Sequence, residues 1–256
     1  MHAPFDAGAD GRGTGTMAAS PAGEMTDSPF ADEVVAMQWI LDQVREDRPL
    51  GVIEAEAVVA TLYVEQRAGG RVEVPLVPVL DVSRYDATHA INVTFLAMAI
   101  ADELQFDNES IRRVGLAALL HDIGMTRVPG DLVAKAGQIS PEERELVKMH
   151  PTEGARILMG ASPTLDLAAV VAYEHHLRTD GGGYPRLLYP RTPHYVSRLV
   201  QVCDVYDALS SARPYRAAWP VEIIISYLSE RAGFEFHPAL AAALTALVQR
   251  GAITAR

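Results

Sequence analysis

Histidine and aspartate residues recur along this chain at intervals that constrain how it can fold. Successive groups are separated by 25 to 32 residues, and the groups are His89, His121-Asp122, His150, His175-His176 and Asp204. One or two helices with their loops occupy about that length, so a helical bundle can bring one or two of these side chains per element to a common centre. The spacing therefore fits a bundle whose distant segments converge on one site.

The chemistry of these side chains suits a metal centre. Imidazole and carboxylate bind divalent Zn, Mn or Fe. Seven ligands are too many for one tetrahedral metal ion and fit two metal ions that share a carboxylate. Two metal ions roughly 3.5–4 Å apart commonly catalyse the cleavage of phosphate esters. Asp122 is the candidate shared carboxylate, with His121 on one ion. A lone helical histidine more often has no special role, so the joint pattern carries the prediction.

Composition excludes several other classes of protein. The net charge of −11 argues against binding a nucleic-acid polymer, which needs a basic face, but it allows a small anionic ligand beside metals and local arginines. Cys203 is the single cysteine, so no intrachain disulfide forms and a reducing compartment fits. The sequence contains no run of about 18 apolar residues, so it predicts no membrane-spanning helix. We expect a soluble cytoplasmic protein.

The apolar pattern divides the chain into three parts. Residues 1–29 are rich in Gly, Ala, Ser, Thr and Pro, and we expect a disordered leader. Residues 30–80 predict a small helical segment, with helices from Ala31 and over 53–66, then an extended connector or short hairpin over 72–80. Residues 81–256 read as an all-α domain. Its expected helices cover 86–104, 108–121, 141–149, 152–159, 164–176, 194–211, 221–232 and 238–250.

Some helix boundaries and buried faces are more sharply predicted than others. Ser140-Pro141-Glu142-Glu143 is a capping box with proline in the first turn. The expected buried positions of the first two helices are Val34, Val35, Met37, Trp39, Ile40 and Leu41, then Val58, Val59, Leu62 and Val64.

Four blocks in order resemble one known family. Leu119-Leu120-His121-Asp122-Ile123-Gly124 resembles the signature of HD-domain phosphohydrolases. The later blocks are His175-His176 with Asp180-Gly181-Gly182-Gly183-Tyr184-Pro185, Asp204-Val205-Tyr206-Asp207-Ala208-Leu209 and Arg213-Pro214-Tyr215-Arg216. Together they resemble the HD-GYP family of cyclic-di-GMP phosphodiesterases, over about residues 85 to 240.

The resemblance implies a mechanism for this chain. All seven candidate ligands match metal positions of the family, and iron or manganese is expected. Some members carry a further acidic ligand where this chain has Tyr85, so two ions are expected rather than three. A hydroxide bridging the ions, next to His121 and Asp122, would attack phosphorus and open cyclic-di-GMP to the linear dinucleotide pGpG.

The resemblance also implies substrate contacts. Gly183, Tyr184 and Pro185 match the family's substrate or partner loop, although three glycines alone indicate only a loop between helices. Arg213 and Arg216 could reach a phosphate near the metals, although most such arginine pairs are a solvated helix end. A GGDEF-domain or other signalling protein is a candidate partner at the Tyr184 loop, and a homodimer is left open.

Three positions depart from the family pattern. Met125 stands where a lysine is expected to contact substrate phosphate, Leu177 replaces a glutamate, and His237 replaces an aspartate. These changes keep alternatives open. One is a weakly active or inactive receptor for cyclic-di-GMP, or a protein-interaction adaptor. Another is an HD hydrolase acting on a different nucleotide, such as another cyclic dinucleotide.

Overall fold

The computed structural model describes residues 30–69, 72–79, 82–133, 135, 137–212 and 217–255, and confirms the predicted all-α fold. The expected leader, 1–29, lies outside these residues. No helix among the described residues is long and apolar enough to cross a membrane. The elements in chain order are α1 (Ala31–Arg45), α2 (Val52–Glu65), β1 (Val74–Leu76), η3 (Val82–Arg84), α3 (Tyr85–Glu103), α4 (Asn108–Leu119), η4 (Ile123–Arg127), α5 (Gly130–Val133), α6 (Pro141–Val147), α7 (His150–Ala161), η5 (Pro163–Leu165), α8 (Asp166–Glu174), α9 (Tyr195–Ser210), α10 (Val221–Glu230), α11 (Pro238–Gln249) and β2 (Ile253–Ala255).

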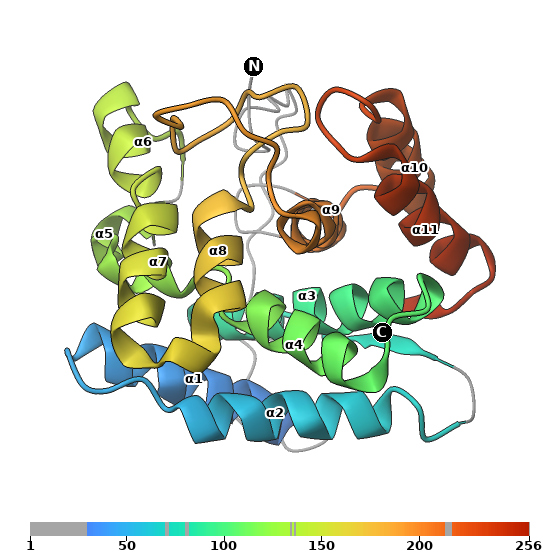
Figure 1. Ribbon diagram of the computed structural model, residues 1–256, viewed down its shortest axis with the longest axis horizontal. Coiled ribbons are helices and arrows are strands. Elements are labelled where there is room, and N and C mark those ends of the chain that lie inside the picture. The colour runs from blue at the N-terminus through green and yellow to red at the C-terminus, as the bar shows by residue number, and fades with distance from the viewer. Residues whose placement is uncertain are drawn as a thin grey trace, which may run out of the picture.

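Helix α3 forms the centre of the bundle. Every residue from Ala87 to Ala101 is buried, because α1, α4, α9 and α11 all pack against this helix. In Figure 1, α1 and α2 lie across the bottom, α5 to α8 rise on the left, and α10 and α11 stand on the right. One continuous apolar core joins these layers, from Val34 in α1 to Ala252 at the C-terminal end.

The N-terminal helices bury narrower faces than the sequence predicts. The buried positions of α1 are Val34, Met37, Ile40, Leu41 and Val44, which repeat every three or four residues. Val35 and Trp39 were predicted to be buried but are 46% and 45% exposed, and Val64 of α2 is 62% exposed. These predictions were wrong because a helix packed on one side buries a single stripe, and these side chains lie outside it.

The connector over 72–80 contains a strand that pairs with the far end of the chain. Val74 to Leu76 runs parallel to Ile253 to Ala255, and the Val74 amide donates to the Ala252 carbonyl at 2.8 Å. The hairpin alternative was therefore wrong. A hairpin needs an antiparallel neighbour close in sequence, whereas this strand finds its partner after α11.

Helices α4, α6, α8 and α10 each end two residues earlier than predicted, and the ends of α4 and α8 carry candidate ligands. Helix α4 stops at Leu119 and α8 stops at Glu174, so His121, Asp122, His175 and His176 all lie in turns. The predicted ends at 121 and 176 were wrong because apolar periodicity continues through a tight turn. The capping box of α6 is confirmed: Ser140 and Glu143 each accept a hydrogen bond from the other's backbone amide.

Candidate metal centre

All seven candidate ligands converge in two adjacent groups. The first contains Asp122, His150, His175 and His176, and the second contains His89, His121 and Asp204. Within each group the ligand atoms lie within 4.8 Å of one another. Helices α3 and α9 supply His89 and Asp204 from their interiors, α7 supplies His150 from its first residue, and the turns after α4 and α8 supply the others.

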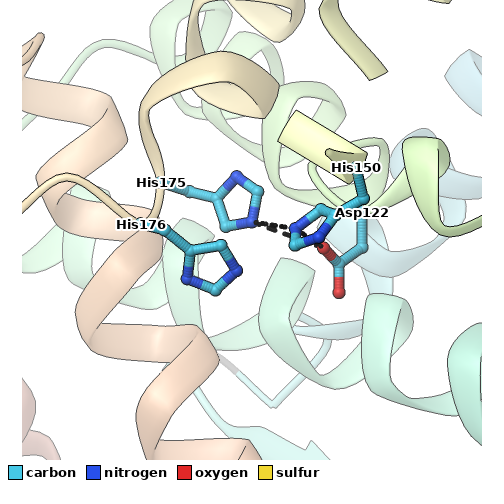
Figure 2. Close-up of side chains that lie close together, drawn as sticks. All are labelled: Asp122, His150, His175 and His176. Atoms are coloured by element: carbon cyan, nitrogen blue, oxygen red, sulfur yellow. Dashed lines mark hydrogen bonds and ion pairs between the residues drawn. The ribbon is translucent and has the colours of Figure 1, made fainter. Parts of the chain in front are cut away.

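The first group is closely packed around one carboxylate oxygen. Asp122 Oδ1 lies 3.2 Å from His150 Nε2 and 3.3 Å from His175 Nε2. The same two nitrogens are 3.2 Å apart. Figure 2 shows His175 and His176 facing His150 and Asp122 across the group.

Backbone carbonyls orient three of the imidazole rings. The Nδ1 atoms of His121, His150 and His175 lie 2.7 Å from Ala118 O, 2.8 Å from Val147 O and 2.9 Å from Ala172 O. Each Nδ1–H therefore donates a hydrogen bond to the carbonyl, which in the neutral ring leaves Nε2 with a lone pair directed at the centre.

This arrangement fits divalent cations. Two neutral Nε2 atoms 3.2 Å apart cannot hydrogen-bond to each other when both protons are on Nδ1. His121 Nε2 is buried without a hydrogen-bond partner. Buried polar atoms seldom remain unsatisfied, and a shared cation satisfies these lone pairs. The residues present therefore suit the divalent metal that the sequence predicts.

Asp122 lies between the two groups. Its Oδ1 faces His150 and His175, while its Oδ2 lies 3.6 Å from His121 Nε2. One carboxylate thus offers one oxygen to each side, as expected for a bridging ligand. Gly124 allows this turn to lie against α7, because a Cβ there would be 1.9 Å from the His150 carbonyl oxygen.

The second group contains a supporting carboxylate that the sequence reasoning did not assign. His89 Nε2 lies 3.2 Å from Asp204 Oδ1, and His89 Nδ1 lies 2.7 Å from Asp207 Oδ2. Asp207 therefore orients His89 and makes it more basic, as carboxylates commonly do for metal-binding histidines. The signal was available, since Asp207 follows Asp204 by three helical positions and shares its face.

The electrostatics differ among the ligands. Burial lowers the pKa of His121 to about 4 and that of His176 well below its usual value. Burial also opposes protonation of His89, but Tyr85, Asp204 and Asp207 outweigh it and raise the His89 pKa. Burial works against ionisation of Asp122, yet His121 and His150 hold its pKa well below the ordinary range. Asp122 is therefore ionised, as a candidate bridging ligand requires.

A cavity of about 440 Å³ opens onto both groups. Gly183 and Tyr184 form one wall, and the Tyr184 ring stacks on His176 with centroids 4.5 Å apart. The turn is tight: Gly183 has φ +86°, and a Cβ there would lie 2.0 Å from the His176 carbonyl oxygen. Tyr85 lines the cavity and stacks on His89 at 5.7 Å.

Other predicted positions lie elsewhere. Pro185 follows Tyr184 but is not among the residues lining the cavity, while Met125 is. Leu177 is buried, His237 immediately precedes α11, and neither residue lines the cavity. Arg213 and Arg216 lie outside the described residues. The sequence reasoning did not anticipate three basic residues that line the cavity, which are Arg144, Lys148 and Arg178.

A carboxylate before the histidine pair has a structural task. Glu174 is buried and accepts hydrogen bonds from the His194 amide at 2.7 Å and from Ser197 Oγ at 2.9 Å. It also pairs with Arg191. Glu174 thus fastens the end of α8 to the start of α9 and holds the intervening loop.

Comparison with known proteins places this fold and site. The family model described as HD domain matches residues 71–240. The cyclic di-GMP phosphodiesterase PA4108 of Pseudomonas aeruginosa is 38% identical over 146 residues, which cover 57% of this chain and 35% of that protein. The 3'3'-cGAMP-specific phosphodiesterase 3 of Vibrio cholerae is 34% identical over 162 residues, covering 63% and 35%. Bd1817, a HDG"Y"P protein from Bdellovibrio bacteriovorus, shares the fold with a TM-score of 0.62 at 18% identity, covering 86% of this chain and 70% of that one.

The chain therefore belongs to the HD domain family, and its resemblance to HD-GYP proteins is confirmed. It spans about a third of the length of the two curated relatives just described, since the matched region is 35% of each.

Proposed function

We propose that this protein is a metal-dependent phosphodiesterase that opens cyclic-di-GMP to the linear dinucleotide pGpG. One observation carries the proposal: seven ligand side chains form two groups joined by Asp122, directly beside a cavity of about 440 Å³. Bridged divalent pairs in such sites hydrolyse phosphate esters. The names of relatives such as PA4108 support cyclic-di-GMP as the substrate.

The proposed roles follow the geometry. Asp122, His150, His175 and His176 hold one ion, and His89, His121 and Asp204 hold the other, with Asp122 shared. Two ions, of Fe or Mn, would supply water activation and neutralise charge on the phosphoryl oxygens. His121 and Asp122 are the proposed catalytic residues.

The loop residues have substrate-binding roles in this proposal. Burial raises the Tyr184 pKa well above its usual value, so its hydroxyl stays protonated and available to donate to substrate. Gly183 shapes the turn that places this ring. Pro185, Arg213 and Arg216 complete the proposed set from the family resemblance, with the two arginines as phosphate contacts.

A protein contact at the same loop is a separate proposal. Tyr184 itself is half-buried against His176, whereas Leu188 and Tyr189 further along the loop are 100% and 66% exposed. A GGDEF-domain or other signalling partner would therefore meet the loop at these two side chains. Copurification with Leu188→Ser and Tyr189→Ser variants tests the contact, and light scattering tests the homodimer.

Two other functions have specific support. The relative from V. cholerae is named for 3'3'-cGAMP, which favours testing a second cyclic dinucleotide. Met125 gives the cavity a neutral side chain where a lysine was expected, which favours a receptor that binds cyclic-di-GMP without cleaving it.

One assay separates the three functions. The protein is reconstituted anaerobically with Fe(II), or with Mn(II), metal per chain is measured, and both cyclic dinucleotides are followed by chromatography. We expect about two ions per chain and accumulation of pGpG from cyclic-di-GMP. Binding of cyclic-di-GMP without turnover supports the receptor, and faster cleavage of 3'3'-cGAMP supports the second substrate. Metal-loaded protein that neither binds nor cleaves either compound contradicts the proposal.

A further inference from the structure

Helix α6 sorts its charges between the cavity and the solvent. Arg144, Val147 and Lys148 line the cavity. Positions i, i+3 and i+4 share one face of a helix, so this face of α6 and its C-cap residue is turned to the site. Glu142 and Glu145 are exposed. In an acidic chain, α6 and its C-cap thus direct two basic residues, Arg144 and Lys148, toward the cavity.

The orientation of α6 is fixed at both ends. At the start, the capping box holds Glu143, which also pairs with Lys135 at 2.7 Å. At the end, the Val147 carbonyl accepts from His150 Nδ1 at 2.8 Å. Val147, whose carbonyl orients His150, is the sequence neighbour of Lys148. The basic face of α6 is therefore held in a fixed position relative to the candidate metal centre.

Several charged groups around the cavity have ion-pair partners of different strength. Arg178 donates to Asp180 through both Nε and a terminal nitrogen. Asp86 pairs with Arg45 at 3.2 Å, and Glu235 adds negative charge to the lining. Lys148 pairs with Glu145 at 2.6 Å, but the Glu145 side chain is 70% exposed. Such a surface pair is weak, so Lys148 can exchange it for a phosphate.

A cyclic dinucleotide carries two phosphodiesters, and the metal centre cleaves one at a time. The second phosphate must lie elsewhere in the cavity, whose lining also includes the acidic Asp86 and Glu235, so it needs a cation there. We infer that Arg144 and Lys148 form the binding wall for this second phosphate. Arg144 and Lys148, on α6 and its C-cap, provide the positive charge for this phosphate that Met125 of η4 cannot provide. The inference rests on the proposed function and adds two substrate-binding residues to it.

Kinetics of single variants test this wall. We expect Arg144→Met and Lys148→Met each to raise KM for cyclic-di-GMP about tenfold, with kcat within about threefold and metal content unchanged. The increase should shrink at high ionic strength, because the lost attraction is screened. The matched control is Arg156→Met, which removes the Arg156–Glu153 pair of the same i,i+3 type at 2.8 Å. Arg156 does not line this cavity, so the KM of the Arg156→Met variant should equal that of the wild type.

Moving the charge provides a second readout. Met125 lines the same cavity, so Met125→Lys in the Lys148→Met background returns a cation to it. We expect KM to fall to within about threefold of the wild-type value. An active wild type with unchanged KM in both single variants overturns this inference alone. A wild type that neither binds nor cleaves either dinucleotide overturns the proposed function, and this inference falls with it.

Discussion

The floor and the side wall of the cavity differ in how deeply their residues are buried. The floor is formed by buried histidines, of which His121 and His175 have no exposed surface, and backbone carbonyls orient their rings. The wall is formed by α6, which contributes no buried residue, and by the loop after His176, where Gly183 is exposed and Tyr184 is half-buried. The candidate metal ligands are thus part of the core, whereas the proposed substrate contacts stand outside it.

This contrast shows how the fold separates two requirements. Metal binding needs several atoms held in close register, and buried packing around α3, α8 and α9 provides that precision. Substrate selection needs side chains that can change without unfolding the protein. Elements with few buried residues tolerate such changes, so α6 and the loop can vary while the metal floor is kept.

The largest expected effect is at the centre of the floor. Asp122→Ala removes the carboxylate between the two ligand groups, and we expect turnover to fall at least about 1,000-fold with loss of bound metal. Chromatography of the dinucleotides and metal analysis measure both. Asp131→Ala, at an exposed position of α5, is the control. Substantial turnover by the Asp122 variant would show that the bridging assignment is wrong.

The next effect is on folding of the floor. At Gly124 a Cβ would meet the His150 carbonyl oxygen at 1.9 Å and the Gly154 amide nitrogen at 2.6 Å. Both obstacles are backbone, so Gly124→Ala should lower the free energy of unfolding by about 3 kcal/mol. At Gly130 a Cβ meets nothing within 4 Å, and the same change there should cost less than about 0.5 kcal/mol. Urea denaturation compares the two, and equal losses would contradict the close approach of η4 to α7.

A smaller effect is expected at Asp207, which contacts the candidate metal ligand His89. Asp207→Asn keeps the shape of the group 2.7 Å from His89 Nδ1 but removes its charge. We expect the affinity of one metal position to fall about 10- to 100-fold, while the position that uses His150 and His175 is unchanged. Competition with a chelator, read by metal analysis, resolves the two. Equal weakening of both positions would mean that Asp207 supports the whole fold rather than His89.

The smallest expected effect is the release of protons from the protein when metal binds. Without metal, burial opposes protonation of His89, but Tyr85, Asp204 and Asp207 outweigh it and raise the His89 pKa well above its usual value, so His89 holds its proton at neutral pH. Metal must displace that proton, so binding at the second group strengthens as pH rises through the raised pKa. His121, with a pKa of about 4, is already neutral. Against the effect of burial, Asp122 likewise raises the His175 pKa. We expect protons to be released from His89 and His175 when metal binds at pH 7, measured by calorimetry in two buffers of different ionisation enthalpy. No release would exclude a protonated His89.

Much of the floor was predictable because its signals are local. Histidines and aspartates at regular intervals on helical patterns identified all seven members of the two groups. Capping chemistry at Ser140 predicted the start of α6. The wall was not predictable in this way, because Arg144 and Lys148 look like ordinary surface charges until the cavity is known. Asp207 was visible only as part of a motif.

Errors in the helical faces have the same origin. Trp39 and Val64 are apolar and lie on helices, yet both are exposed, because burial depends on which neighbour covers the helix. The strand at Val74 needed a partner some 180 residues away, Ile253, and no local pattern points to that distance.

The amino-acid sequence by itself determined the helices, the chemical types of the ligands and the likeness to HD-domain proteins, since each depends on residue identity and short-range spacing. Tertiary structure alone decided that Asp207 reaches His89 and that α6 turns its basic face inward. The reason is physical: these features depend on how helices distant in sequence pack together, and sub-ångström packing decides which polar atoms meet.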